Sequence, residues 1–384
     1  MTTAKPITVA YLIDNFIQGG GTENQLRILL QNIDRDRFRP LLITLRPASV
    51  SSLPKLDCPV LHLGLSRLIS LKTIMAIRQL SHVLKEENVR ILQLFFIDSN
   101  IVGALAGRLA GVKRMIIGRR DMGWWYNFWR LSITNWLNRK VDCCIANARA
   151  VKDVVARVEH IPSENIRVIY NGLEALKQES DAAIVRREIG LPPTLPIVGI
   201  VANIKPIKRI DRFLDIVEEL RDTNAHFLIV GTGVQEEEMR TRVRETGLED
   251  RVHFHSTTSQ VFDVMKLFSV GLLTSETEGL SNVLIEYALA EVPALAFDTG
   301  GNGEVIVDGK TGYVVPCYDT ARLAERVRSL LNDPDKIAAM GKRAREAALE
   351  RFTVERMVKE TEDYYLQILK SDNIRVNAQQ DAET

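Results

Sequence analysis

The stretch SETEGLSNVLIE, residues 275–286, places two glutamates eight positions apart around a glycine. Glu278 precedes Gly279, and Glu286 lies in the apolar run that follows Ser281. Glycine permits turns that other residues resist, and serine is a favoured helix N-cap. The pattern predicts a loop that becomes a helix, with Glu278 before the helix and Glu286 in its second turn.

A helix start flanked by two carboxylates can bind a ligand that carries both phosphate and hydroxyl groups. The free backbone N–H groups bind phosphate, whereas the two oxygens of a carboxylate accept hydrogen bonds from a diol such as a ribose. A nucleotide with an attached sugar would satisfy both glutamates and the helix start. Two other interpretations are solvated glutamates near a helix start and a hydrolase-type carboxylate pair.

Short apolar runs alternate with helical patterns along the chain, and after residue 196 the alternation starts again. The predicted strands are 7–13, 38–45, 89–96, 114–118, 142–147, 196–204, 225–231, 251–255, 269–274 and 293–298. The predicted helices are 23–33, 211–222, 235–246, 260–267, 282–290, 331–352 and 353–370. This order predicts two α/β sheets with parallel strands and ligands at the strands' carboxyl ends.

The polar stretch after Asn171-Gly172 predicts a domain junction, with a hinge near that dipeptide. We expect an N-terminal domain over 1–175 and a C-terminal domain over 176–352. A helix over 353–370 would pack back toward the first domain, and 371–384 would be a disordered tail.

Composition excludes several classes of protein. The 50 basic and 49 acidic residues give no support for nucleic-acid binding. The four cysteines lack metal-ligand spacing, and no run of 18 apolar residues or signal peptide is present, so we expect a cytoplasmic protein. The triplet Asp34-Arg35-Asp36 resembles a metal-binding motif but follows a helix, away from the predicted site, so we expect no metal.

Residues 275–316 hold several signals in a fixed order: Glu278, Glu286, the Gly300-Gly301 pair with Glu304, and the Gly309–Gly312 turn. This region resembles the donor-binding part of retaining GT-B-fold glycosyltransferases of family 4, also called group 1. GGGTENQL (19–26), VIYNGLE and VANIKPIKRID resemble other segments of that family. The resemblance implies two Rossmann-like doubly wound domains facing across a cleft. The N-terminal domain, 1–175, would be on the acceptor side, and the C-terminal domain, 176–352, would bind the nucleotide sugar.

The resemblance also implies residue roles. Glu286 would bind the donor ribose, Glu278 would lie beside the transferred sugar, and Lys208 would neutralise the diphosphate leaving group. The implied donor-binding residues are Gly20, Gly21, Asn203, Lys208, His255, Glu278, Gly279, Leu280, Ser281, Asn282 and Glu286.

Two positions depart from the family pattern. Asn203 stands where the family often has a second cationic residue, and Arg120 stands where it often has a histidine. Arginine is not a base at neutral pH, so Arg120 would position or stabilise charge, and Asp121 is the nearby group that could accept a proton. An Arg–Asp surface pair is the alternative. The implied catalytic residues are Glu278, Lys208, Arg120 and Asp121.

The expected function is retaining transfer of a hexose-type sugar from a nucleoside diphosphate to a saccharide or lipid-linked acceptor, in surface polysaccharide synthesis. No cofactor is expected, because the nucleotide sugar is a substrate. The alternatives are a nucleotide-sugar epimerase or hydrolase, a non-catalytic binding protein, and a Rossmann oxidoreductase, whose glycine spacing FIQGGGTENQ fits poorly.

All four tryptophans lie within residues 118–140. On a helix, one face would carry Trp125, Phe128, Trp129, Ile133, Trp136 and Leu137, accompanied by Arg130, Arg139 and Lys140. Such a stripe most often packs against its own sheet. The other interpretations are peripheral membrane contact through residues 124–140 and an aromatic wall for the acceptor.

Overall fold

The structure is a computed structural model that describes residues 5–17, 20–46, 56–68, 70–174, 181–256 and 261–371. Apart from Ser371, the predicted tail lies outside these residues. The chain divides into an N-terminal unit, Met1–Gly172 with Val354–Thr384, and a C-terminal unit, Leu173–Thr353. Each unit is described by itself.

The N-terminal unit is built on a parallel sheet in the order β3-β2-β1-β4-β5-β6-β7. Its strands are β1 (Ile7–Ile13), β2 (Phe38–Thr44), β3 (Val60–His62), β4 (Val89–Phe95), β5 (Arg114–Arg119), β6 (Cys143–Ala146) and β7 (Ile166–Val168). Residues 9–13 of the central strand β1 are fully buried, as expected for a strand covered by helices on both faces.

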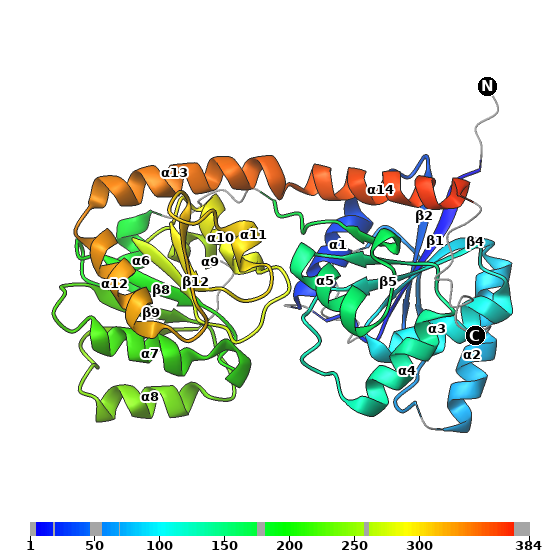
Figure 1. Cartoon of the computed structure of the whole chain (residues 1–384), viewed down its shortest axis with the longest axis horizontal. Coiled ribbons are helices and arrows are strands. Elements are labelled where there is room, and N and C mark those ends of the chain that lie inside the picture. The colour runs from blue at the N-terminus through cyan, green and yellow to red at the C-terminus, as the bar shows by residue number, and fades with distance from the viewer. Residues whose placement is uncertain are drawn as a thin grey trace, which may run out of the picture. The chain divides into compact units, whose positions relative to one another are not determined.

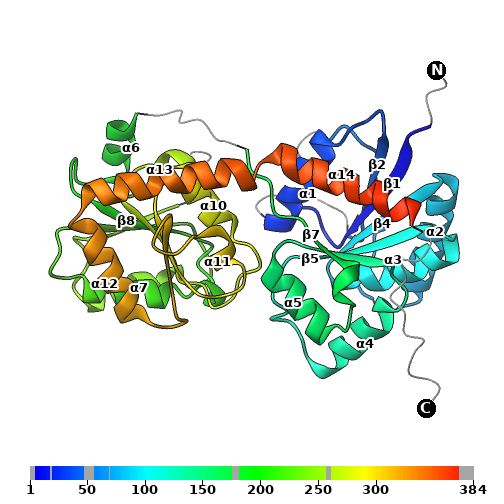
Figure 2. The same cartoon turned by 45° about the horizontal axis from the view of Figure 1, so that its top comes forward.

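Helices cover both faces of this sheet (Figure 1). They are α1 (Gly21–Asn32), α2 (Leu71–Glu86), α3 (Ile97–Ala110), α4 (Phe128–Asn138), α5 (Arg149–Val158) and α14 (Val354–Lys370), with a 3-10 turn η2 (Ser163–Asn165). On one face α1 packs against α14, and on the other α3 packs against both α2 and α4 (Figures 1 and 2).

The last helix, α14, completes the core of the N-terminal unit. Tyr365 is fully buried, and its hydroxyl donates to Gln93 on β4 and lies 3.4 Å from the Tyr11 hydroxyl on β1. The buried Glu362 accepts from the backbone N–H of Asp34 at 2.8 Å and pairs with the exposed Arg37 at 3.0 Å. A segment more than 300 positions away in the sequence therefore closes this core.

A buried ion pair holds together the carboxyl end of β5, the loop before α4, the end of α4 and the end of α5. Arg119 donates to both carboxylate oxygens of Glu159, at 2.7 and 2.9 Å. Tyr126 and Asn138 donate to the same carboxylate at 2.5 and 3.1 Å. Burial alone would raise the pKa of Glu159, but Arg119 and these hydrogen bonds outweigh burial and hold the pKa below its usual value.

The interpretation that the tryptophan stripe packs against the sheet is wrong. The face of α4 turned toward the sheet carries Thr134, Leu137 and Asn138. Asn138 is tied to Glu159, and this polar anchor turns the aromatic face outward. Trp129 is 75% exposed, and helix α4 begins at Phe128, so Trp125 precedes it.

The C-terminal unit repeats the same architecture with the strand order β10-β9-β8-β11-β12-β13, all parallel. Its strands are β8 (Ile197–Val201), β9 (His226–Val230), β10 (Val252–His255), β11 (Val270–Leu273), β12 (Ala294–Phe297) and β13 (Gly312–Val315). Its helices are α6 (Ala182–Ile189), η3 (Pro206–Lys208), α7 (Ile210–Glu219), α8 (Glu236–Glu245), α9 (Val261–Met265), α10 (Asn282–Leu289), α11 (Asn302–Val305), α12 (Thr320–Leu331) and α13 (Pro334–Arg351).

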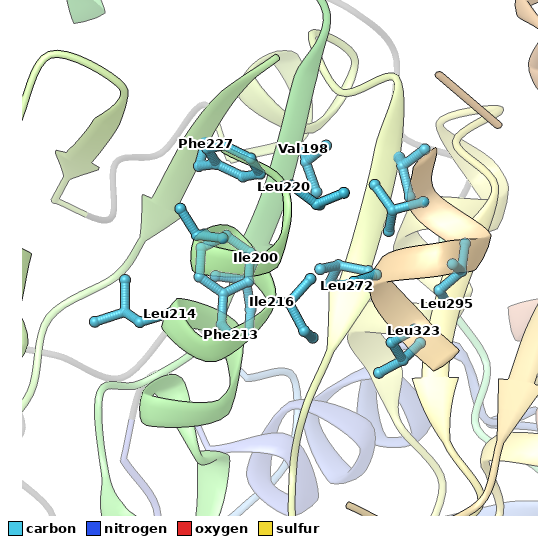
Figure 3. Packing of buried hydrophobic residues seen from close by; sticks show 14 of the residues in the cluster. Val198, Ile200, Phe213, Leu214, Ile216, Leu220, Phe227, Leu272, Leu295 and Leu323 are labelled. Carbon is cyan, nitrogen blue, oxygen red and sulfur yellow. The ribbon is translucent and has the colours of Figure 1, made fainter. Parts of the chain in front are cut away.

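The core of this unit follows from the helical spacing of α7. Phe213, Ile216 and Leu220 recur on one helix face and pack toward Val198 and Ile200 of β8, with α12 covering the neighbouring strands (Figure 3). All five side chains are completely buried. The strand β8 is therefore fixed in the centre of the sheet, where it positions the loop that follows it.

The predicted helix 331–352 corresponds to α13, which begins three residues later than predicted, whereas the preceding helix α12 was not predicted. Helix α12 ends at Leu331, and α13 begins at Pro334. Proline disfavours a helical residue before it but is well suited to the first helical position. Asp333 caps the new helix, because its side chain accepts from the backbone N–H of Lys336 at 3.0 Å.

We expect Glu159→Ala to lower the free energy of unfolding of the N-terminal unit by about 3–5 kcal/mol, because Arg119 would stay buried without its carboxylate. Urea unfolding followed by tryptophan fluorescence measures this loss, since every tryptophan lies in this unit. The control is Glu87→Ala, which breaks an exposed pair with Arg39 and should cost less than about 1 kcal/mol. Equal losses would contradict the assignment of Glu159 as a buried anchor.

Candidate functional site

The strand order of the C-terminal unit reverses next to β8. The chain leaves β8 for β9 on one side, whereas β11 pairs with β8 on the other. Ligands of doubly wound sheets bind at such switch points, beyond the carboxyl ends of the strands. Here the two flanking loops are 202–209 and 274–281, and they hold most of the residues predicted to bind a donor.

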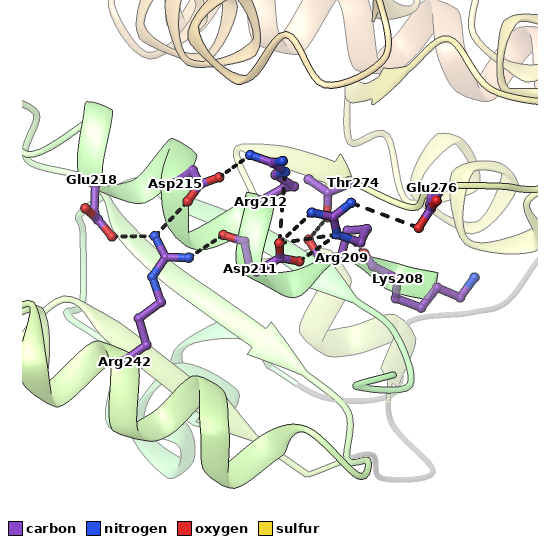
Figure 4. Close-up of polar contacts among 9 residues, drawn as sticks. All are labelled: Lys208, Arg209, Asp211, Arg212, Asp215, Glu218, Arg242, Thr274 and Glu276. Atoms are coloured by element: carbon purple, nitrogen blue, oxygen red, sulfur yellow. Dashed lines mark hydrogen bonds and ion pairs between the residues drawn. The ribbon is translucent and has the colours of Figure 1, made fainter. Parts of the chain in front are cut away.

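The loop after β8 is stiffened by a network of ion pairs (Figure 4). Arg209 has φ 51°, which is strained for a residue other than glycine, and its guanidinium binds Asp211 at 2.8 Å. Arg242 of α8 reaches across to Asp215 and Glu218 of α7, each at 2.7 Å. These contacts fix the backbone immediately after Lys208.

The loop after β11 is joined to the loop after β8 through the backbone. The N–H of Glu276 donates to the carbonyl of Ile207 at 2.9 Å. The hydroxyl of the buried Thr274 donates to the carbonyls of Lys208 and Arg209, at 3.1 and 3.0 Å. The two loops therefore form one rigid platform at the switch point.

Lys208 and Glu278 meet across this platform. The Lys208 Nζ lies 2.6 Å from Glu278 Oε1, and their side chains are 27% and 11% exposed. The structure thus brings together the two residues that the sequence analysis assigned to the leaving group and to the transferred sugar. Because the pair is partly shielded from water, salt screens its attraction less than that of an exposed ion pair.

Helix α10 begins beside this ion pair. Ser281 stands at its N-cap, as the sequence predicts, but its side chain makes no capping hydrogen bond. Among the described residues, no carbonyl or side chain accepts from the N–H groups of Gly279, Leu280 or Ser281. These donors and the positive end of the helix dipole form a seat for an anion.

Glu286 lies in the second turn of α10, as predicted. The side chain is partly buried, and no described residue donates a hydrogen bond to its carboxyl group. Burial alone raises its pKa to about 7. A carboxyl group held in this way can accept hydrogen bonds from a hydroxylated ligand.

The Gly300-Gly301 pair packs directly on the glutamate loop. Gly300 has φ 53°, and a Cβ atom there would lie 1.7 Å from the carbonyl oxygen of Glu278. The N–H of Gly301 donates to the carbonyl of Gly279 at 2.7 Å. Only glycine fits position 300, since any side chain would displace the backbone that carries Glu278.

The other predicted donor residues lie near the same edge. Asn203 is exposed two residues after the end of β8, and His255 ends β10 with partial burial. The carbonyl of His255 accepts from the N–H of Gly231 at 2.9 Å, so its backbone is tied to the end of β9. Neither side chain joins the Lys208–Glu278 pair.

In the N-terminal unit, Gly20 and Gly21 form the start of α1. Gly20 is the N-cap, and a Cβ atom there would lie 2.0 Å from the Glu23 carboxylate. Burial raises the pKa of Glu23 and lowers the pKa of Arg120 to about 10, while the two charges attract each other. Glycine at position 20 therefore lets Glu23 fold back over the helix start, close to Arg120.

Arg120 and Asp121 have different partners, so the interpretation as an Arg–Asp surface pair is wrong. The Arg120 guanidinium donates to Asn171 Oδ1. Asp121 Oδ1 accepts from the Gly123 N–H at 2.7 Å and from Trp125 Nε1 at 3.0 Å. Burial raises the pKa of Asp121, although the Gly123 N–H opposes that shift.

Both residues line a cavity of about 250 Å³ at the carboxyl ends of β1, β4 and β5. Its wall is formed by Asp14, Thr22, Phe95, Phe96, Ile97, Gly118, Arg119, Arg120, Asp121, Trp124, Trp125 and Arg130. The cavity combines aromatic surfaces with carboxylates and guanidinium groups, which is the chemistry that saccharides bind. It lies at the switch point of the first sheet, where β1 pairs with both β2 and β4.

Asp14 and Phe96 of this cavity were not predicted from the sequence. Asp14 accepts from both the N–H and the hydroxyl of Ser99, at 2.7 and 2.5 Å, and burial raises its pKa to about 6. Phe96 has φ 66°, a strained conformation that often marks a functional position. A charged residue directly after a buried strand was the available signal for Asp14, whereas Phe96 carried none.

Within the described ranges, no group of three or more histidine, cysteine, aspartate or glutamate side chains is arranged to hold a metal ion. Asp34 and Asp36 form a turn in which the N–H of Asp36 donates to Asp34 Oδ1 at 2.9 Å. No helix of the described chain has both the length and the hydropathy of a membrane span.

Comparison with solved structures defines the class of protein. The structure superposes on a glycosyltransferase from Rickettsia africae with a TM-score of 0.85 at 17% identity, covering 96% of this chain and 100% of the other. It superposes on Anabaena HepE, solved in complex with UDP and glucose, with a TM-score of 0.82 at 20% identity, covering 94% and 99%. The fold is GT-B, built from two Rossmann-like units.

Comparison with sequence families identifies the group. The Glycosyltransferase Family 4 model matches residues 19–175, and the Glycosyl transferases group 1 model matches residues 181–347. The chain belongs to this family of GT-B glycosyltransferases. It is 31% identical over 235 residues to N-acetyl-alpha-D-glucosaminyl L-malate synthase of Bacillus anthracis, a match that covers 57% of this chain and 61% of that relative, less than two thirds of its length.

We expect Gly300→Ala to destabilise the C-terminal unit more than Gly309→Ala. Both glycines have positive φ, but a Cβ atom at Gly309 meets nothing within 4 Å, whereas at Gly300 it meets the Glu278 carbonyl. Gly309→Ala should cost about 1–2 kcal/mol from the backbone conformation alone, and Gly300→Ala should cost more. Urea unfolding followed by far-UV circular dichroism measures both, and equal losses would contradict the close contact.

We expect the stability of the C-terminal unit to depend on pH through Glu286. Its folded pKa of about 7 lies above the ordinary value, so its contribution to stability is complete below about pH 4.5 and is lost as pH rises through 7. Relative to Glu286→Gln, the parent should lose on the order of 2 kcal/mol between pH 5 and pH 9. Parallel stability curves for the two proteins would show that Glu286 titrates normally.

Proposed function

We propose that this protein is a retaining glycosyltransferase that moves a hexose-type sugar from a nucleoside diphosphate to a saccharide or lipid-linked acceptor, in the synthesis of surface polysaccharide. The observation that carries the proposal is the Lys208–Glu278 pair beside the start of α10. A cation, a row of free N–H groups and two carboxyl groups meet there at one switch point.

The donor diphosphate would bind at the N–H groups of Gly279, Leu280 and Ser281. The arrival of this anion draws Lys208 toward the phosphates, because a diphosphate carries more charge than one carboxylate. Glu278 then exchanges its ammonium partner for a sugar hydroxyl. Glu286, further along α10, would accept hydrogen bonds from the ribose hydroxyls.

Lys208 would also stabilise the transition state. As the bond between the anomeric carbon and the phosphate oxygen breaks, negative charge grows on the diphosphate, and a fixed cation stabilises that charge most when it is fully developed. The acceptor oxygen bonds to the anomeric carbon on the face that the diphosphate leaves. The departing phosphate oxygen takes the acceptor proton, so the reaction needs no protein base and, in this proposal, no metal or other cofactor.

The cavity of the N-terminal unit is proposed to bind the acceptor. Trp124 and Trp125 provide flat surfaces for a sugar ring, and Asp14 and Asp121 can accept hydrogen bonds from its hydroxyls. Arg120 stays a cation even with its lowered pKa, so it would orient the acceptor or stabilise charge rather than remove a proton.

The comparisons support this proposal in coarse terms. Anabaena HepE was solved with UDP and glucose, and the Bacillus anthracis relative is named for an N-acetylglucosaminyl product. Both fit a nucleotide-sugar donor for this chain. We also propose that the protein works in the cytoplasm, where its unpaired cysteines would stay reduced.

A thermal-shift panel of UDP-, GDP- and ADP-sugars tests donor binding. We expect the sugar nucleotides of one base to raise the Tm by about 5 °C at a concentration near 100 times Kd. Glu286→Ala should lose most of this Tm shift. Lys208→Met should lose the shift caused by nucleoside diphosphates. The weaker shift caused by the free nucleoside, which has no phosphate, should stay unchanged in Lys208→Met. The matched control is Glu346→Ala, at an exposed position of α13 in the same unit.

The panel also separates this proposal from its alternatives. A donor shift that Glu286→Ala leaves intact would refute the site. Rapid turnover of the donor without any acceptor would indicate an epimerase or hydrolase. A donor shift without transfer to any of a set of saccharide and lipid-linked acceptors would indicate a binding protein.

A further inference from the structure

A cluster of large apolar side chains lies uncovered on the N-terminal unit. Trp124, Phe128, Trp129, Ile133 and Trp136 are 68, 74, 75, 47 and 50% exposed. They stand on the loop before α4 and on the outward face of that helix. Exposed aromatic patches of this size mark interaction surfaces in soluble proteins.

Two neighbouring helices extend the cluster. The first turns of α2 expose Leu71, Ile74 and Met75, by 82, 51 and 68%, at the spacing of one helix face. The strained Phe96, 39% exposed, immediately precedes α3. Each of the three helices thus presents apolar side chains at or near its start.

Topology places these helix starts at one edge. Helices that follow parallel strands begin at the carboxyl edge of the sheet, and α2, α3 and α4 follow β3, β4 and β5. Helix α3 packs between α2 and α4, and Figure 1 shows the three side by side. With about 8–10 Å between neighbouring helix axes, the exposed residues at the three helix starts form a row roughly 20 Å long, which continues along α4 to Trp136 in the last turn of that helix.

The charges along this row are almost all positive. Residues 122–140 hold no aspartate or glutamate but include Arg130, Arg139 and Lys140, and residues 65–85 hold no acid either. Near α3, the Asp98 carboxylate is paired with Arg46 at 2.5 Å. The Lys140 Nζ lies 4.4 Å from the centroid of the Trp136 ring, so its charge sits directly on the aromatic surface.

We propose that this row is a docking surface for an anionic lipid bilayer. The docking surface consists of Leu71, Ile74, Met75, Phe96, Trp124, Phe128, Trp129, Ile133, Trp136, Arg139 and Lys140. Its aromatic residues would enter the headgroup region, and its cations would bind lipid phosphates. An anionic bilayer offers negative charge along its whole surface, whereas a protein partner offers carboxylates only at separate points. The docking surface has tryptophans and cations but no acids, so it fits a bilayer better than a protein partner.

Docking would bring the acceptor cavity to the bilayer. Trp124 belongs both to the docking surface and to the wall of the cavity. A lipid-linked acceptor could therefore enter the cavity while its lipid stays in the membrane. This step rests on the proposed function, whereas docking itself does not.

Vesicle binding by the full-length protein tests the inference. All four tryptophans lie in residues 124–136, so intrinsic fluorescence reports on this region alone. With phosphatidylcholine vesicles that contain phosphatidylglycerol, we expect a blue shift of the emission and co-sedimentation, both reduced by added salt. With pure phosphatidylcholine we expect binding about tenfold weaker or less.

Variants locate the contact. Phe128→Ser with Trp129→Ser should weaken vesicle binding about tenfold or more, and Arg139→Gln with Lys140→Gln should remove most of the preference for anionic lipid. Val234→Ser, which changes an 85% exposed side chain of the C-terminal unit, is the control and should bind as the parent does. Circular dichroism checks that each variant is folded.

Three results would overturn the inference. The first is no vesicle binding by the parent, and the second is equal binding by the Phe128/Trp129 variant. The third is a concentration-dependent dimer that this variant abolishes, because the surface would then be a contact between two copies of the chain. Because vesicle binding is measured without donor or acceptor, its failure leaves the proposed function untouched. A loss of donor binding, in turn, leaves the docking result untouched.

Discussion

The ion pair between Lys208 and Glu278 joins two loops whose residues are 70 positions apart in the sequence. It forms only because the strand order reverses at β8, which places the loops after β8 and β11 side by side. Any anionic ligand at this edge meets two glutamates, so their charge must be reduced before it can bind. Lys208 neutralises one carboxylate and burial favours protonation of the other. The site can therefore hold two carboxyl groups with little net negative charge, so that an approaching anion is not repelled.

In the N-terminal unit, the buried pair of Arg119 and Glu159 performs a comparable structural role. It fixes the end of β5, from which Arg120 and Asp121 enter the cavity, and it receives Asn138 from the inner face of α4. The same carboxylate thus sets the shape of the cavity and the outward direction of the aromatic face. A polar anchor explains why this helix exposes tryptophans that hydrophobicity alone would bury.

Most strands and the glutamate loop followed from sequence because their signals are local, whereas the short edge strands β3, β7 and β13 were not predicted. Buried parallel strands are short apolar runs, and the order of Glu278, Glu286, Gly300 and Gly301 specifies one loop. Helix α3 was missed because it is apolar on most sides and contains Gly103 and Gly107, which allow close packing on Leu94 and Met115. The direction of the tryptophan face and the partners of Arg120 depend on Glu159 and Asn171, which are distant in sequence, so no local pattern could predict them.

Helix α14 carries a consequence for biosynthesis. The ribosome releases residues 5–172 first, yet Tyr365 and its neighbours fill the core over β1 and β4. Until residues 354–370 have been made, that sheet keeps an apolar face open to the solvent, whereas residues 173–353 already include the described strands and helices of the second unit. The second unit to be made can thus be the first to finish folding, and the nascent first unit is the part of the chain that a chaperone would need to shield.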